Sequence, residues 1–199
     1  MRRLRIAAWI SVALLLTVIG LAYVLRPDAL KVSVSLPLSA RIGGPFELTT
    51  HEGRRMSSAE LEGTPFVVFF GFTHCPDVCP TTLLDLTNLI RRLGPDADRL
   101  RYLFISVDPE RDTPELLKLY LSNFDPRITG LTGTPQEIAS VAKAYGAIYQ
   151  KVATKNGFTY NHTAEVYLMG KDGHRVGTLN DQEPEDVQLK KLRRLIGLS

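Results

Sequence analysis

The chain has 199 residues, 44% of them hydrophobic and 23% charged, which suits one globular domain with an appendage. Its formal net charge of +3 comes from four arginines that precede the first acidic residue, Asp28, and the remainder is close to neutral. A near-neutral body lacks the basic surface that nucleic-acid binding requires, so we expect no nucleic-acid partner.

Residues 6–25 form the first predicted element, a run of twenty residues without a charge that arginines flank on both sides. A helix of about twenty apolar residues spans a hydrocarbon core of roughly 30 Å. A cleaved signal peptide is the alternative, but its apolar region is usually about 7–15 residues long, and we see no convincing small-residue cleavage site. We therefore predict a transmembrane helix.

The positive-inside rule keeps the arginine-rich N-terminus in the cytoplasm and sends the rest of the chain across the membrane. We predict cytoplasmic arginines and an anchor in residues 1–26, a linker in 27–42 and a single domain in 43–199. The short basic N-terminus lacks a long transit peptide, which favours a single-pass protein of the bacterial inner membrane. Its domain would face the periplasm, where disulfides can persist.

The domain begins with a predicted hairpin and a buried strand. Residues 46–50 alternate in polarity, a turn follows at 51–53, and the pattern resumes at Met56. Residues 65–70 are a continuous apolar run, typical of a strand buried on both faces. A helix follows Cys79, with Pro80 in its first turn and leucines at helical spacing up to Gly94.

The rest of the chain alternates strands and helices. We predict strands at 100–107, 128–131, 148–152, 164–169 and 176–179, and helices at 113–121, 134–145 and 184–198. Thr113 is the expected N-cap of the first of these helices, and Thr134 with Glu137 fits a capping box. The basic end of the terminal helix could touch anionic lipid, but its leucines favour packing on the body. The alternation predicts one α/β domain with a central mixed sheet flanked by helices.

The only cysteines, Cys75 and Cys79, lie four residues apart at the predicted strand-to-helix junction. This spacing puts both side chains on one face of a helical turn, about 6 Å apart, where they suit either a disulfide or a shared metal ion. Backbone N–H groups and the helix dipole favour a thiolate at such a junction. The pair is therefore a redox site or part of a metal site.

A metal site here needs a third ligand. Two thiolates are too few for a structural zinc site, which takes four protein ligands, but they suit Cu(I), and a histidine would complete a trigonal site. His51 and His174 lie in polar turns and are expected on the surface, and His74 should point away from its neighbour Cys75. His162 precedes the strand at 164–169 and can reach the same sheet edge as the cysteines. It is our candidate ligand, with a hydrogen-bonded loop histidine as the alternative.

Several motifs in order resemble the SCO/SenC family. They are the run 71–80 around the cysteines, Val-Asp-Pro-Glu-Arg-Asp-Thr-Pro at 107–114, Phe-Asp-Pro at 124–126, Gly-Leu-Thr-Gly at 130–133, Asn-His-Thr at 161–163 and Tyr-Leu at 167–168. The resemblance extends from about Gly43 to the C-terminus. It implies a thioredoxin-like fold and a membrane-tethered copper metallochaperone, which delivers copper to the binuclear copper centre of cytochrome c oxidase or reduces the thiols of that centre.

The resemblance also implies the ligands and partners. Cys75, Cys79 and His162 match the family's copper ligands, for copper as Cu(I), Cu(II) or both. The implied partners are the copper-bearing subunit of the oxidase, an upstream copper donor or thiol reductant, and the membrane itself. One departure is Asn161, where the family often has an aspartate before the histidine, so a charged neighbour of the site is missing.

Other functions of the cysteines remain open in the sequence. A thiol-disulfide oxidoreductase would use Cys75 and Cys79 as attacking and resolving thiols, although the usual redox motif has two intervening residues and this chain has three. Thr73 and Cys75 weakly resemble a peroxidatic loop, and a copper or redox sensor is a further alternative. We predict a metallochaperone rather than an enzyme.

Two acidic features have alternative interpretations. Asp77, between the cysteines, either shapes their loop or meets a partner. The charged residues at 108 and 110–112 are expected to form a solvated turn with local ion pairs, with a partner-docking loop as the alternative.

Overall fold

The computed structural model of the chain describes residues 9–10, 13–18, 21, 42–155 and 157–198. The chain separates into two units, and the second, Arg41–Ser199, contains every strand described below. Most of the predicted anchor and nearly all of the predicted linker lie outside the described residues. Among the residues described, no helix is both long and apolar enough to cross a membrane.

The main sheet has seven strands in the order β2-β1-β5-β4-β3-β8-β9. These are β1 (Glu47–Thr50), β2 (Arg55–Ser57), β3 (Phe66–Gly71), β4 (Arg101–Ser106), β5 (Ile128–Thr132), β8 (Val166–Met169) and β9 (Arg175–Leu179). The central strands β3, β4 and β5 are parallel, and the outer pairs are antiparallel. Every residue of β3 is buried, as its apolar run predicts. The predicted central mixed sheet is confirmed.

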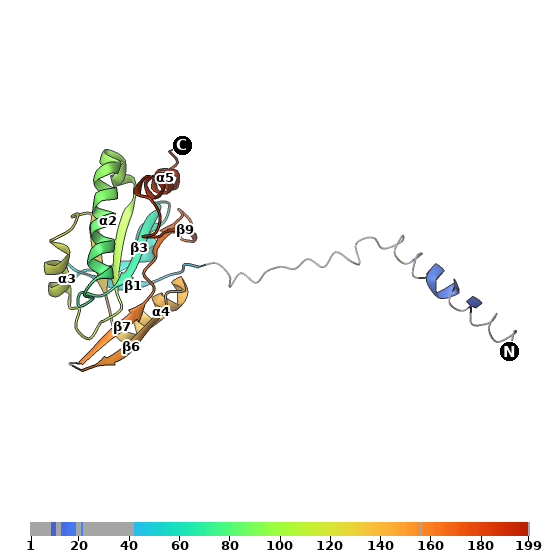
Figure 1. Cartoon of the computed structure of the whole chain (residues 1–199), viewed down its shortest axis with the longest axis horizontal. Coiled ribbons are helices and arrows are strands. Elements are labelled where there is room, and N and C mark those ends of the chain that lie inside the picture. Colours follow the sequence, from blue (N-terminus) through green and yellow to red (C-terminus); the bar gives the residue numbers. More distant parts are fainter. Residues whose placement is uncertain (1–8, 11–12, 19–20, 22–41, 156, 199) are drawn as a thin grey trace. The chain divides into compact units, whose positions relative to one another are not determined.

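The helices pack around this sheet. They are α2 (Val78–Leu93), α3 (Pro114–Leu121), α4 (Pro135–Tyr145) and α5 (Glu185–Leu195), with 3-10 turns η3 (Ser58–Leu61) and η4 (Gly94–Arg99). Helix α2 begins at Val78, earlier than predicted, so Cys79 lies in its first turn. Thr113 caps α3, and the Thr134–Glu137 capping box opens α4, as predicted. Leu189 and Leu192 of α5 are buried, and α5 contacts α2 (Figure 1), so the terminal helix packs on the body.

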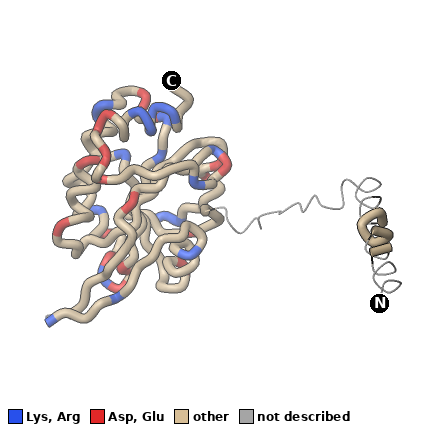
Figure 2. Tube along the Cα trace, turned by 45° about the vertical axis from the view of Figure 1, so that its right-hand side comes forward, with Lys and Arg blue, Asp and Glu red and all other residues tan. Residues whose placement is uncertain are grey.

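Strands β6 (Tyr149–Thr154) and β7 (Gly157–His162) form a separate two-stranded ribbon that projects from the rest of the fold (Figure 1). Figure 2 shows basic residues along this ribbon, and acidic and basic residues interspersed over the rest of the folded unit. The prediction that His162 lies in a loop is wrong, because His162 is the last residue of β7, a strand that was not predicted. Phe158, Thr159 and Tyr160 favour strands, but this run is only three residues long, between Gly157 and Asn161. The sequence Asn-Gly at 156–157 is the local signal for a hairpin with β6.

One edge of the main sheet collects the chain segments that carry the functional side chains. Gly71 pairs with Ser106, so the parallel strands β3 and β4 end together at this edge. Val166 opens β8 opposite Phe69, so the antiparallel strand β8 begins there. The loop 72–77, the loop 107–113 and the link 163–165 therefore converge at one place. This confirms the argument that the segment before β8 reaches the strand-to-helix junction.

Candidate metal centre

The two cysteines lie at the end of β3 and the start of α2. Cys79 is fully buried in the first turn of α2, and Cys75 is half-buried in the preceding loop. The backbone N–H of Cys79 donates to Sγ of Cys75 at 3.4 Å, and both cysteines are free. The pair is thus present as two thiols, one at the surface and one beneath it.

His162 completes the group from the end of β7. Its Nε2 lies 3.3 Å from Sγ of Cys79, and its Nδ1 lies 2.9 Å from the carbonyl oxygen of Thr163. A carbonyl only accepts, so Nδ1 carries the proton and Nε2 presents its lone pair to the cysteines. The ligand atoms of Cys75, Cys79 and His162 all lie within 4.8 Å of one another, which positions the three residues to hold one metal ion.

Aromatic side chains fix the His162 ring. Phe69 of β3 and Phe72, which directly follows β3, meet the imidazole in edge-on contacts with centroid distances of 6.2 and 5.6 Å. Phe72 also packs against Tyr160 of β7 at 5.6 Å. Asn161 is exposed on the opposite face of β7, because adjacent strand residues point in opposite directions. The departure from the family at residue 161 therefore faces away from the site.

Burial sets the protonation of both buried ligands. It raises the pKa of the Cys79 thiol well above its usual range, and the hydrogen bond with Cys75 raises it further. Burial lowers the pKa of His162, against the opposing hydrogen bond to Thr163. The expected thiolate is wrong for Cys79 in the metal-free protein, because desolvation outweighs the helix terminus. Metal binding must therefore displace a proton from Cys79.

The lowered pKa of His162 predicts a pH dependence of stability. The unfolded chain takes up this proton first as the pH falls, so the contribution of His162 is complete above pH 6.5 and is lost as the pH falls through the folded-state pKa. We therefore expect the free energy of unfolding of the metal-free protein, measured in urea, to fall less steeply below pH 6.5 in His162→Gln than in the parent. His74→Gln is the control, and equal slopes in parent and His162→Gln would contradict this cause.

The absence of a side chain at Gly71 makes room for the sulfur atom of Cys79. A Cβ at this position would lie 2.7 Å from Cε2 of Phe104 and 2.9 Å from Sγ of Cys79. We expect Gly71→Ala to reduce the free energy of unfolding by about 1–3 kcal/mol, because overpacking forces one neighbour to move. Gly177→Ala is the matched control, since its Cβ would meet only Leu168 at an ordinary 3.7 Å. Equal denaturation midpoints for the two variants would show that the space at Gly71 is not needed.

The predicted solvated turn after β4 is wrong for its two aspartates, which are fully buried. Asp112 accepts hydrogen bonds from the hydroxyl of Thr73 at 2.6 Å, the backbone N–H of Thr73 at 3.0 Å and the hydroxyl of Ser106 at 2.6 Å. The burial of Asp112 is therefore compensated by three donors. Its carboxylate fastens the cysteine loop to the end of β4.

Asp108 is the second buried acid. Burial raises the pKa of its carboxyl, opposed by the guanidinium of Arg111, whose Nε donates to Oδ2. Glu110 is exposed and binds Lys151 of β6 at 2.7 Å. Of the four charged residues at 108 and 110–112, only Glu110 is exposed. Local ion pairs are present as predicted, but the Arg111–Asp108 pair joins a half-buried side chain to a fully buried one.

The other histidines lie outside the three-residue group. His74 is exposed and near Thr73, so it points away from Cys75 as expected. It groups with Asp108 and Asp112, but both carboxylates already accept hydrogen bonds from side chains of the fold. His51 and His174 are half-buried rather than fully at the surface, and Nδ1 of His51 accepts from the backbone of Gly130.

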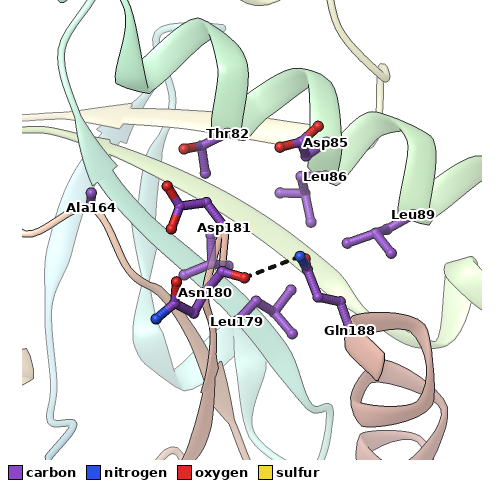
Figure 3. A pocket seen from close by; sticks show the side chains of 10 residues that line it. Thr82, Asp85, Leu86, Leu89, Ala164, Leu179, Asn180, Asp181 and Gln188 are labelled. Carbon is purple, nitrogen blue, oxygen red and sulfur yellow. Dashed lines mark hydrogen bonds between the residues drawn. The ribbon is translucent and has the colours of Figure 1, made fainter. Parts of the chain in front are cut away.

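A pocket elsewhere in the fold lies between α2, β9 and α5 (Figure 3). The side-chain amide of Gln188 donates to the carbonyl of Asn180 at its margin. Burial raises the pKa of the Asp85 carboxyl in its wall, and nearby Glu185 and Asp181 add to this. The lining contains no cysteine or histidine, so the pocket offers no soft ligand and is separate from the candidate metal centre.

The donor set fits copper better than zinc. Two sulfurs and one imidazole nitrogen give three ligands, and a structural zinc site needs a fourth. Thiolates suit Cu(I), and imidazole also suits Cu(II). The fold and the site together define a thioredoxin-like domain with a dithiol–imidazole centre.

The comparisons assign the chain to a family. The SCO1/SenC family model matches residues 35–197, so the chain belongs to this family. The chain is 39% identical over 163 residues to the mitochondrial protein SCO2 of Saccharomyces cerevisiae, and the match covers 79% of this chain and 54% of the yeast protein. The chain thus spans about half the length of that relative.

Solved structures agree with this assignment. The structure of ScoI from Bradyrhizobium japonicum with copper bound has a TM-score of 0.73 and 47% identity, and covers 77% of this chain and 99% of ScoI. The structure of BsSco, described as having a disulfide switch and as a member of the Sco family of cytochrome c oxidase assembly proteins, has a TM-score of 0.66 and 27% identity. It covers 80% of this chain and 96% of BsSco.

Proposed function

We propose that this protein is a membrane-anchored copper chaperone, which binds one copper ion through Cys75, Cys79 and His162 and delivers it to the binuclear copper centre of cytochrome c oxidase. The observation that carries the proposal is the convergence of the three ligand atoms within 4.8 Å, from the first turn of α2, the loop before it and the end of β7. The copper-bound ScoI structure supports the choice of metal.

The different exposure of the ligands suggests a direction for transfer. Loading displaces the proton of the Cys79 thiol, while Nε2 of His162 is already unprotonated. Half-exposed Cys75 is the ligand that an incoming thiol can replace first, and buried Cys79 is the last to release the ion. Cys79 regains its proton on release, which favours departure of the metal.

The anchor and the compartment are part of the same proposal. Residues 1–26 would hold the protein in a bacterial inner membrane, 27–42 would act as a spacer, and 43–199 would work in the periplasm. The uncharged run at 6–25 and the similarity to a Bradyrhizobium protein support this arrangement. An upstream copper donor or a thiol reductant would supply the metal or keep the cysteines reduced.

A transfer assay tests the delivery step. The copper-loaded full chain in detergent is mixed with the metal-free, reduced copper domain of the oxidase subunit, and the absorption spectrum of the recipient is followed. We expect copper to move to the recipient, and the Cys75→Ser chain to deliver none. Retention of copper by the parent, with a reduced recipient present in excess, would contradict the proposal.

Thiol-disulfide exchange is the second candidate, because both cysteines are free and lie close together in space. The description of BsSco as having a disulfide switch favours it. The raised pKa of Cys79 makes this thiol a poor nucleophile, so Cys75 would have to attack. If His162→Ala reduces the oxidised recipient at the same rate as the parent, exchange is favoured, because dithiol chemistry does not need the imidazole.

A further inference from the structure

His162 is the one ligand of the candidate centre that lies outside the segment leading from β3 into the first turn of α2. It ends β7, and the ribbon of β6 and β7 shares no strand pairing with the seven-stranded sheet among the described residues. The cysteines, in contrast, are fixed by the end of β3 and by α2. The geometry of the site therefore depends on whatever holds the ribbon against the body.

Arg111 grips the ribbon at Phe158. Its Nη1 donates to the carbonyl oxygen of Phe158 at 3.2 Å, and its guanidinium carbon lies 3.9 Å from the centroid of the Phe158 ring. Side chains at alternate positions of a strand share a face, so Phe158, Tyr160 and His162 point to the same side of β7. The rings of Phe158 and Tyr160 meet at 5.8 Å, and Tyr160 packs on Phe72, which contacts His162.

Arg111 is itself held by the body. Its Nε donates to Asp108, which is fully buried, and the side chain of Arg111 is only 25% exposed. Four residues after Asp108, the same loop reaches the cysteine loop, where Asp112 accepts hydrogen bonds from the backbone N–H and the hydroxyl of Thr73. One short loop thus holds the cysteine loop at one end and the histidine ribbon through Arg111.

The second cation near Phe158 is less suited to this task. Lys151 lies 3.8 Å from the ring and pairs with Glu110, but both charged side chains are about half exposed, at 43% and 53%. Exposed ion pairs contribute little in water. A planar guanidinium, unlike an ammonium group, can stack on the ring, donate to the carbonyl and bind Asp108 at the same time.

We propose that Arg111 is a positioning residue that holds His162 in the metal site by clamping β7 at Phe158. The inference rests on the proposed function for the identity of the ligands. Losing the clamp would leave the two thiols in place and release the imidazole. Cu(I) accepts low coordination by thiolates, whereas Cu(II) depends on the nitrogen ligand, so Arg111 would control the binding of Cu(II) more than that of Cu(I).

The test compares full-length chains in detergent by competition titration with each copper ion. The main variant is Asp108→Asn/Arg111→Met, which removes the guanidinium together with the buried charge that it compensates. Phe158→Ala is the second variant, because it removes the stacked ring without disturbing Asp108. Lys155→Met, a loss of charge at an exposed position near the turn of the same ribbon, is the matched control.

We expect Cu(II) affinity to fall about 10–100-fold in the main variant, as for other residues that orient a metal ligand, with little change in Cu(I) affinity and none in the control. When the same substitutions are made in His162→Ala, Cu(II) affinity should fall no further than in His162→Ala alone. Arg111→Lys alone should lower Cu(II) affinity as well, because lysine cannot replace the guanidinium. Equal losses for both ions, or an undiminished loss in the His162→Ala background, would overturn the inference and leave Arg111 a structural role only.

A measurement on metal-free protein separates this inference from the proposed function. Amide hydrogen exchange should become faster in β6 and β7 of the main variant and of Phe158→Ala, and remain unchanged in β3 and β4. If His162→Ala binds both ions like the parent, the ligand assignment fails, and the exchange data still decide whether Arg111 holds the ribbon. Unchanged exchange in β7 would overturn the clamp.

Discussion

Cys79→Ser is expected to lower Cu(I) affinity by more than about a hundredfold, and His162→Ala to lower Cu(II) affinity by a similar factor. Even a residue that only orients a ligand costs about 10–100-fold when it is replaced, so loss of a ligand should cost more. Serine leaves a hard oxygen where Cu(I) prefers a soft sulfur, and alanine removes the only nitrogen ligand among the three. The measurement is competition of each variant with a chelator, separately for the two ions.

His74→Ala is the matched control for His162→Ala. His74 is adjacent to Cys75 in the sequence, but its Nδ1 lies 3.0 Å from the hydroxyl of Thr73, and His74 is not in the three-residue group. The variant should bind both ions like the parent. A loss as large as that of His162→Ala would contradict the assignment of the nitrogen ligand.

Asp112→Ala is expected to reduce the free energy of unfolding by about 3–5 kcal/mol, the largest stability effect that we predict. The carboxylate accepts three hydrogen bonds in a fully buried position, and its removal leaves the N–H of half-buried Thr73 and the hydroxyl of buried Ser106 without an acceptor. Each buried donor left in this way costs about 1–3 kcal/mol. Urea unfolding of the reduced, metal-free protein measures the change.

The neighbouring substitution Thr113→Ala serves as the control for Asp112→Ala. Thr113 is exposed and caps α3 by accepting one hydrogen bond from the backbone N–H of Leu116, so loss of its hydroxyl should cost only about 1 kcal/mol. Asp112→Ala should also increase the rate at which Cys75 reacts with a thiol reagent, because the loop is no longer fastened. Similar losses in both variants, with unchanged labelling of Cys75, would show that Asp112 does not hold the loop.

Local patterns in the sequence predicted most of the fold. The continuous apolar run became the fully buried strand β3, the spaced leucines became the buried face of α2, and Thr113 and Thr134 cap their helices as expected. Strand β7 was missed although Phe158, Thr159 and Tyr160 favour strands and the sequence Asn-Gly at 156–157 is a hairpin signal. The favourable run is only three residues long and lies between Gly157 and Asn161, so it was taken for a loop.

At the site, contacts between residues far apart in the sequence left no local signal. The cysteine pair is a local motif, but Cys79 and His162 lie 83 residues apart, and only the expected sheet edge connected them before the family resemblance. The burial of Asp112 depends on Thr73, 39 residues away, so its charge was mistaken for a solvated one. The raised pKa of Cys79 likewise follows from packing against distant parts of the chain, not from its position at a helix terminus.

X-ray absorption at the copper edge of the loaded, full-length protein tests the central claim most directly. We predict one copper per chain, with two sulfur ligands and one imidazole nitrogen in its shell, and loss of the imidazole signal in His162→Ala. A copper shell without sulfur, or an imidazole signal that persists in His162→Ala, would contradict the assignment of Cys75, Cys79 and His162 as the copper site.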